Sequence, residues 1–238
     1  MSTSTLAITP SASAHFPSAF WERLWRTSGM QFGVFFIITY VIYGYQPGVG
    51  ASTDALTAFY TGNRTRILIA AVFSGLNILN LMWFAAALRA TLSDAGKEGW
   101  GAAATASSAA FGALSLMQIA VAAAVAYSIA GSGNQPLTSG LNDLSWALVV
   151  LTAFPRAMLI MSGVFGLWRA GSISNALFAA GVGAVVLGVL GGTTWLTGGV
   201  WAPDGIYSRF VSPLLLIIWI VVVSRVLLAR TPASRAAW

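Results

Sequence analysis

The chain has 238 residues, of which 57% are hydrophobic and only 8% are charged, and its formal net charge is +6. A typical soluble domain carries about 25% charged residues, so this composition excludes an ordinary soluble globular protein. Cysteine is absent and the single histidine, His15, lies in a polar stretch, so we expect no disulfide, haem or metal site and no cofactor.

The first 26 residues divide into a polar tail and a short amphipathic segment. Residues 1–17 are rich in Ser, Thr, Ala and Pro, which predicts a disordered tail. From Ser18 onward the apolar residues alternate with charged ones at helical spacing, which predicts a helix on the membrane surface. An extension of the first membrane span would explain the same residues.

Six apolar runs predict six membrane-spanning helices, because each run approaches the length of about 20 residues that a bilayer requires. Barrel strands would instead alternate in hydrophobicity, and these runs do not. We expect one all-α bundle over residues 18–230, followed by a tail of residues 231–238. The predicted spans cover residues 29–45, 66–89, 102–130, 144–168, 175–195 and 207–229.

The connections between the spans carry weaker signals. Within the loop of residues 46–65, residues 54–60 predict a surface helix capped by Ser52 or Thr53. Residues 131–143 are rich in Gly, Ser and Asn and contain no Lys or Arg, which predicts a loop. In the fifth span, small residues recur every four positions from Ala180, which favours close helix packing.

The distribution of Arg and Lys predicts the orientation in the membrane. Cytoplasmic segments carry an excess of these residues, and placing both termini in the cytoplasm gives eight inside against three outside. An even number of spans agrees with two basic ends, so we expect a multi-pass protein of the inner, or plasma, membrane. The inside residues are Arg23, Arg26, Arg89, Lys97, Arg169, Arg225, Arg230 and Arg235, and the outside residues are Arg64, Arg66 and Arg209.

The most informative residue is Arg156, which follows Pro155 at the centre of the fourth apolar run. It lies about 18 Å along the helix from either end of the run. An arginine at the centre of a span costs about 3 kcal/mol on insertion scales, so its side chain is expected to face the bundle interior or a wet cavity. No acidic residue lies at the middle of any predicted span.

The groups that could contact Arg156 at this depth are neutral. Asn77 and Asn80 are three residues apart on one helix face, while Gln118 and Thr152 lie at similar depth on the third and fourth spans. Thr39 and Tyr40 of the first span are further candidates, and Pro155 leaves the carbonyl of Leu151 without its helical donor. We therefore predict a ligand-binding site formed by Arg156, Asn77, Asn80, Gln118 and Thr152.

Two interpretations of this polar group remain open. Asn and Gln side chains often hold helices together in lipid, and carbonyl groups and water could satisfy Arg156, so the group could be purely structural. Alternatively, an arginine without a carboxylate partner is suited to bind an anion from outside the chain. A fatty acid, a lipid phosphate or a carbonyl-bearing quinone would provide the acceptor.

The second span and its flanks resemble a broad group of bacterial six-helix membrane proteins of unknown function. The shared pattern is an Arg64-Thr65-Arg66 start, an apolar span, and a Trp83-Phe84 pair before Leu88-Arg89. A Phe-Pro pair, here Phe154-Pro155, is also frequent in a later span of that group. The resemblance implies membrane location and helix count, and it implies no activity or catalytic residue.

Three functions are compatible with the sequence. The first is binding or transport of an amphipathic or anionic small molecule at Arg156, with the bilayer as the surrounding partner. The second is an accessory or scaffold subunit that contacts another membrane protein or a second copy of this chain. The third is an intramembrane, cyclase-like enzyme using the loop acids Asp54, Asp143 or Asp204. Nucleic acid is not an expected partner, because no basic run contains interleaved aromatic residues.

Overall fold

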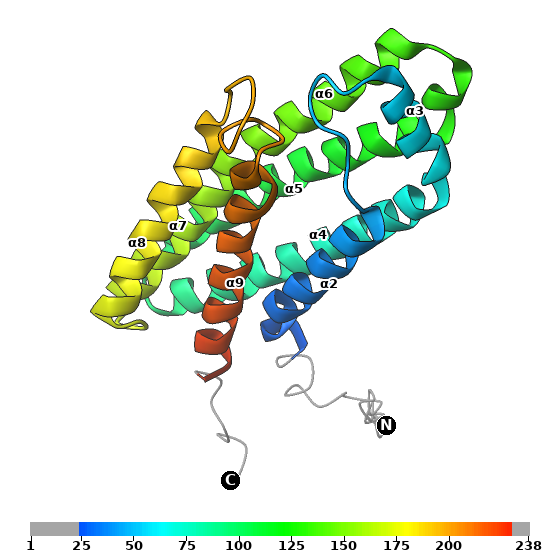
Figure 1. Ribbon diagram of the computed structural model, residues 1–238. Helices are drawn as coiled ribbons and strands as arrows, with labels where there is room; N and C mark the ends of the chain where they lie inside the picture. Colours follow the sequence, from blue (N-terminus) through cyan, green and yellow to red (C-terminus); the bar gives the residue numbers. More distant parts are fainter. Residues whose placement is uncertain (1–23, 230–238) are drawn as a thin grey trace, which may run out of the picture.

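The computed structural model describes residues 24–229, and its elements are helical. Short π-helical and 3-10 turns extend α5 and α8 and lead into α9, at Val125–Ile129, Ala130–Ser132, Gly191–Thr193 and Tyr207–Val211. The predicted all-α class is therefore confirmed for this part of the chain. The helices are α2 (Ser28–Tyr43), α3 (Thr53–Gly62), α4 (Arg64–Asp94), α5 (Glu98–Ala124), α6 (Gln135–Leu151), α7 (Ala153–Arg169), α8 (Asn175–Leu190) and α9 (Ser212–Ala229) (Figure 1).

Five helical segments are long and apolar enough to cross a membrane, which supports a membrane protein. Helix α2 is also apolar, but its 16 residues are fewer than the roughly 20 that a span requires. The predicted tails and most of the predicted surface helix lie outside the described residues, although residues 24–26 are helical. The five segments are Arg64–Asp94, Glu98–Ser132, Gln135–Arg169, Asn175–Thr193 and Tyr207–Ala229.

The prediction of a loop over residues 131–143 is wrong for most of its length, because α6 begins at Gln135. The side chain of Asn134 accepts a hydrogen bond of 3.2 Å from the backbone N–H of Leu137, and Pro136 occupies the first turn. Both are helix-start signals, which the Gly- and Ser-rich composition obscured. By contrast, the surface helix predicted after Ser52 is confirmed as α3, and Ser52 accepts from the N–H of Ala55.

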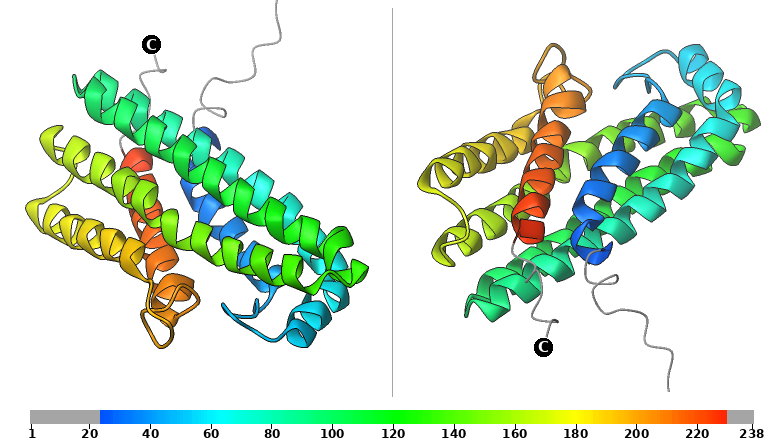
Figure 2. Two further views of the ribbon diagram at one scale, coloured as in Figure 1. Left: turned by 90° about the horizontal axis from the view of Figure 1, so that it is seen from above. Right: turned by 90° about the horizontal axis from the view of Figure 1, so that it is seen from below.

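The helices form a ring around the interior of the bundle. Helix α2 packs on α4, α4 on α5, α5 on α6 and α7, and α9 contacts both α2 and α7 (Figure 2). Helix α8 lies against α7 on the outside of this ring, and α3 lies across one end of α6. We call that end of the bundle the α3 end. The first and last described residues both lie at the opposite end (Figure 1).

Helices α2 and α9 approach most closely near the end opposite α3. A Cβ atom added to Gly29 would lie 2.7 Å from the ring of Phe84 and 2.9 Å from Ile220, and it would also collide with the hydroxyl of Ser224. A Cβ atom on Gly33, one turn later, would make ordinary contacts of 3.4 Å. Glycine at position 29 therefore permits the crossing of the two helices.

This crossing gives a first prediction. Gly29→Ala is expected to lower the free energy of unfolding by about 1 to 3 kcal/mol, because the added methyl group overfills a packed contact. Gly33→Ala is the control, since its methyl group has room, and its stability should stay within about 1 kcal/mol of the parent. Thermal unfolding of the purified protein in detergent measures both, and equal stability of the two variants would contradict the close crossing.

Candidate functional site

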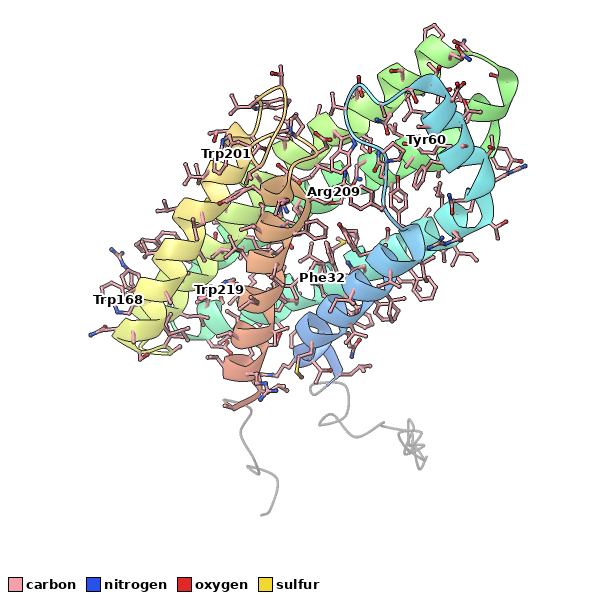
Figure 3. All side chains as sticks on the ribbon, in the orientation of Figure 1. Phe32, Tyr60, Trp168, Trp201, Arg209 and Trp219 are labelled. Carbon is pink, nitrogen blue, oxygen red and sulfur yellow. The ribbon has the colours of Figure 1, made fainter. Side chains whose placement is uncertain are left out.

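The interior of the ring contains a cavity of about 170 Å³. It lies between α2, α4, α5, the α6–α7 pair and the start of α9, and it is lined by both aromatic and polar side chains. An apolar cavity of about 150 Å³ accommodates benzene in another protein, so this one has room for a small ring or a polar head group with a few carbons. Figure 3 shows Arg209 where α9 begins and Phe32 nearer the opposite end of the bundle.

Four of the five predicted site residues line this cavity: Asn77, Gln118, Thr152 and Arg156. The structure therefore brings together polar groups from α4, α5 and the α6–α7 pair, as their predicted depths suggested. Asn80 does not line the cavity, because its side-chain amide donates a hydrogen bond of 3.0 Å to the carbonyl of Leu76 in its own helix. Thr39 and Tyr40, the further candidates from α2, do line it.

Arg156 is held by the break between α6 and α7. Pro155 has no N–H group, and α6 ends at Leu151 just before it. The guanidinium of Arg156 donates to the carbonyls of Thr152 and Val149, at 3.2 and 3.3 Å. The carbonyl of Leu151, which the sequence suggested as an acceptor, is not used by Arg156. Backbone carbonyls thus satisfy part of this side chain, as the structural interpretation predicted.

The remaining donors of Arg156 are available to the cavity. The side chain is only 5% exposed, and its Nη1 group donates no hydrogen bond within residues 24–229. The ring centroid of Phe111 lies 6.0 Å from the guanidinium carbon, which is a cation–π distance. No carboxylate of the described residues pairs with this cation, and a buried cation without one favours a bound anion.

Two further polar atoms of the cavity wall have no hydrogen-bond partner in the described chain. They are Asn77 Oδ1 and Thr39 Oγ1, and both are buried. Leaving a buried polar group unpaired costs about 1 to 3 kcal/mol, so such atoms are uncommon in folded proteins. The side-chain amide of Asn77 and the hydroxyl of Thr39 therefore have the capacity to bind a polar ligand.

A second buried cation, Arg209, lines the same cavity, although its position in the sequence predicts an outer segment beside the membrane. It is 6% exposed and sits in the π-helical turn Tyr207–Val211 that precedes α9. Both of its Nη groups donate to the carbonyl of Gln46 at 3.1 Å, and its Nε donates to the carbonyl of Asp204 at 3.2 Å. The sequence gives no signal for this burial, because both acceptors are backbone carbonyls.

Aromatic rings flank Arg209 and help to bury its charge. Its guanidinium carbon lies 3.8 Å from the ring centroid of Tyr45 and 4.5 Å from that of Trp146. Like Arg156, it has no carboxylate partner among the described residues. Arg209 also lines a separate pocket beside the loop that contains Asp204, so it forms the wall between that pocket and the cavity.

Residues 45–50, which we call the strap, cover the α3 end of the cavity. The side-chain amide of Gln46 is the centre of the attachment: it accepts from Tyr43, and its Nε2 lies 3.2 Å from Tyr60 Oη and 3.1 Å from Asn142 Oδ1. Asn142 also donates to the carbonyl of Gly48 at 3.0 Å. These bonds connect the strap to α2, α3 and α6.

The hydroxyl of Tyr60 on α3 contributes to this network as a donor. It donates to Asn142 Oδ1 at 3.1 Å, and its side chain is fully buried. Burial raises the pKa of Tyr60 to about 12, partly offset by its hydrogen bonds with Tyr43 and Gln46. The hydroxyl therefore remains protonated near neutral pH, and the attachment of the strap does not titrate there.

The loop acids do not contribute to the cavity wall. Asp54 lies in the first turn of α3, Asp143 accepts from the N–H of Gly50 at 3.3 Å, and Asp204 lines the pocket beyond Arg209. None of the three lines the cavity. Acid catalysis requires a carboxylate that reaches the substrate, so the cyclase-like alternative has no acid at this site.

Comparison with known proteins adds no relative. No family model, no curated protein and no solved structure matches the chain. The resemblance to bacterial six-helix membrane proteins stays a prediction, and the cavity with its two arginines is the feature from which a function can be inferred.

Proposed function

We propose that this membrane protein binds, and in that way stores or transports, an amphipathic molecule whose anionic head occupies the cavity beside Arg156. The observation that carries the proposal is the charge of the cavity wall. Arg156 and Arg209 are both buried there, and neither has a carboxylate partner among residues 24–229. An anionic head would accept hydrogen bonds from Arg156 and neutralise charge that is costly in a low-dielectric interior.

The same proposal includes the topology predicted from the sequence. Residues 24–26 are helical and precede α2, so the two segments together contain about 20 residues, enough to cross a bilayer at 1.5 Å per residue. Helix α2 together with residues 24–26 would then be a span in addition to the other five, which gives six in total. Both termini would lie in the cytoplasm, because the charge count favours that side, and the inner, or plasma, membrane would be the location. The accessory-subunit alternative stays a prediction.

Binding of stearate to the purified protein tests the proposed function. Stearate carries one carboxylate, and its methyl ester has the same chain without the charge, so the ester is the matched control. We expect stearate to bind at least about tenfold more tightly, because hydrogen bonds to a charged group contribute about 1.5 to 3 kcal/mol. Equal affinity for the acid and the ester, or no binding of either, would refute an anion site.

The two asparagines of α4 provide a second prediction. Asn77→Ala is expected to weaken stearate binding by about tenfold, the value of one hydrogen bond to a charged group, because the side-chain NH2 of Asn77 lines the cavity and can donate to the carboxylate. Stability should stay within about 1 kcal/mol, because the Asn77 side chain makes no hydrogen bond to the described residues that could be lost. Asn80→Ala is the control and should not change binding, since Asn80 bonds its own helix and does not line the cavity. Calorimetric titration of both variants measures the difference, and a larger loss with Asn80→Ala would place the ligand elsewhere.

A further inference from the structure

The proposed binding site raises the question of how a ligand reaches it, and two of the possible directions are closed. At the end opposite α3, the cavity borders the packed apolar core, in which Phe32, Phe84 and Leu81 are fully buried or nearly so. Side chains in such a core interdigitate at crystal-like density and leave no passage. A ligand therefore does not reach Arg156 from that end.

The α3 end is closed by the strap. Besides the side-chain bonds of Gln46, three backbone carbonyls of the strap accept hydrogen bonds. The first accepts from Trp146 at 2.8 Å, the second from Asn142 at 3.0 Å, and the third from both Nη groups of Arg209 at 3.1 Å. Opening this end would break these buried and partly buried bonds together. Each buried bond broken without a replacement costs about 1 to 3 kcal/mol, so opening this end is unfavourable.

The side between α2 and α9 is different. The two helices touch near Gly29 and Gly33 and diverge toward the α3 end (Figures 1 and 2). Where they are apart, the ring of Tyr40 from α2 meets the ring of Phe210 before α9, with centroids 5.9 Å apart in an edge-on arrangement. Arg26, just before α2, donates to the carbonyl of Leu227 at 3.2 Å near the end opposite α3, but no hydrogen bond of the described residues joins the two helices at this ring pair. We call this ring pair the seam.

The seam lies between the cavity and the exterior of the bundle. Tyr40 lines the cavity, yet 37% of its surface is exposed, and Phe210 beside it is 44% exposed. In a membrane-spanning bundle an exposed aromatic face on the helix ring contacts lipid. A single ring contact is weaker than the buried hydrogen bonds of the strap, and separating two rings leaves no polar group unpaired.

We infer that the ligand of the proposed site is a long-chain carboxylate, such as a fatty acid, that moves laterally from the bilayer into the cavity through the seam of Tyr40 and Phe210. This inference rests on the proposed function. The cavity volume is consistent with an acyl chain that extends out of the cavity. A space of about 170 Å³ holds a head group and a few carbons, but it cannot enclose a whole acyl chain. With the carboxylate at Arg156, the remainder of the chain lies between α2 and α9 and extends into lipid.

A reversible cross-link across the seam tests this route. The chain contains no cysteine, so the double variant Tyr40→Cys with Phe210→Cys can be joined specifically by a short, reducible bis-thiosulfonate reagent. The probe is stearate with a nitroxide label near the middle of its chain, where bound stearate would lie between α2 and α9, supplied in phosphatidylcholine vesicles. Its immobilised fraction, followed by electron paramagnetic resonance, reports loading. Cross-linking should slow loading at least tenfold, and reduction of the same sample should restore the original rate.

The matched control joins two rings of similar spacing that do not line the cavity. Phe35 on α2 and Phe73 on α4 have centroids 6.0 Å apart, so Phe35→Cys with Phe73→Cys takes the same reagent. Its loading rate should stay within twofold of the uncross-linked protein. Equal loading with and without the Tyr40–Phe210 cross-link would overturn the lateral route while leaving the proposed function intact. An uncross-linked parent protein that takes up no probe would overturn both.

Discussion

Arg156→Met is expected to remove most of the binding of a long-chain carboxylate and at the same time to leave the protein as stable as before, or more stable. Losing a charge-assisted hydrogen bond should weaken binding by about 2 kcal/mol, roughly 30-fold. Without ligand, however, Arg156 is a buried cation held only by the carbonyls of Val149 and Thr152 in the described chain. Replacing buried charges with apolar side chains of similar size often stabilises a protein by about 1 to 4 kcal/mol.

The opposite signs of the two effects separate a binding role from a structural one. If Arg156 only stabilised the junction between α6 and α7, Arg156→Met would lower the unfolding temperature and leave binding unchanged. That result would refute the anion site. Arg66→Met is the control. Arg66 also donates to backbone carbonyls, those of Val41 and Ile42, but it is exposed and does not line the cavity. Binding should be unaffected in that variant.

Gln46→Ala is expected to cause the largest loss of stability of the variants considered. The side chain of Gln46 is 4% exposed and takes part in hydrogen bonds with Tyr43, Tyr60 and Asn142. Its removal breaks these three hydrogen bonds, at about 1 kcal/mol for each, so the total should be about 3 kcal/mol. Tyr60 and Asn142 still bond each other, but the hydroxyl of Tyr43 loses its acceptor. For a domain of this size that corresponds to a fall of about 10 °C in the unfolding temperature.

Alanine at position 46 keeps the backbone carbonyl that binds Arg209, so this variant tests the side chain alone. Gln31→Ala is the matched control, because the amide of Gln31 makes a single hydrogen bond of 3.1 Å, to Thr27, in α2. It should cost less than about 1 kcal/mol. Differential scanning fluorimetry in one detergent compares the two. A fall no larger for Gln46→Ala than for Gln31→Ala would show that the strap is not held by this network.

Some features of the site follow from the sequence because they depend on local composition. A central arginine in an apolar run, with no acid at similar depth in any other run, predicts a buried cation without a carboxylate partner, and the described residues agree. The depths of Asn77, Gln118 and Thr152 likewise place them near one level of the bundle. Helix rise is constant, so the position along a span can be counted from the sequence.

Other features depended on the rotation of each helix about its own axis and on contacts between segments that are distant in the sequence. Asn77 and Asn80 are equivalent by spacing, but only Asn77 faces the cavity, because the neighbouring helices decide how α4 is turned. The α6 start at Gln135 was missed because one capping residue outweighs a loop-like composition. Arg209 was assigned to the membrane flank, since no sequence pattern indicates that the carbonyl of Gln46 lies beside it.

The sequence by itself determined a helical membrane protein with a lone arginine at mid-depth, because hydrophobic runs and buried charge are properties of each segment alone. Only the tertiary structure decided that this arginine shares a cavity with Arg209, that the strap closes one end, and that Tyr40 and Phe210 meet across α2 and α9. Residues 46 and 209 are far apart in the chain, and their contact arises from the packing of whole helices, which local patterns do not encode.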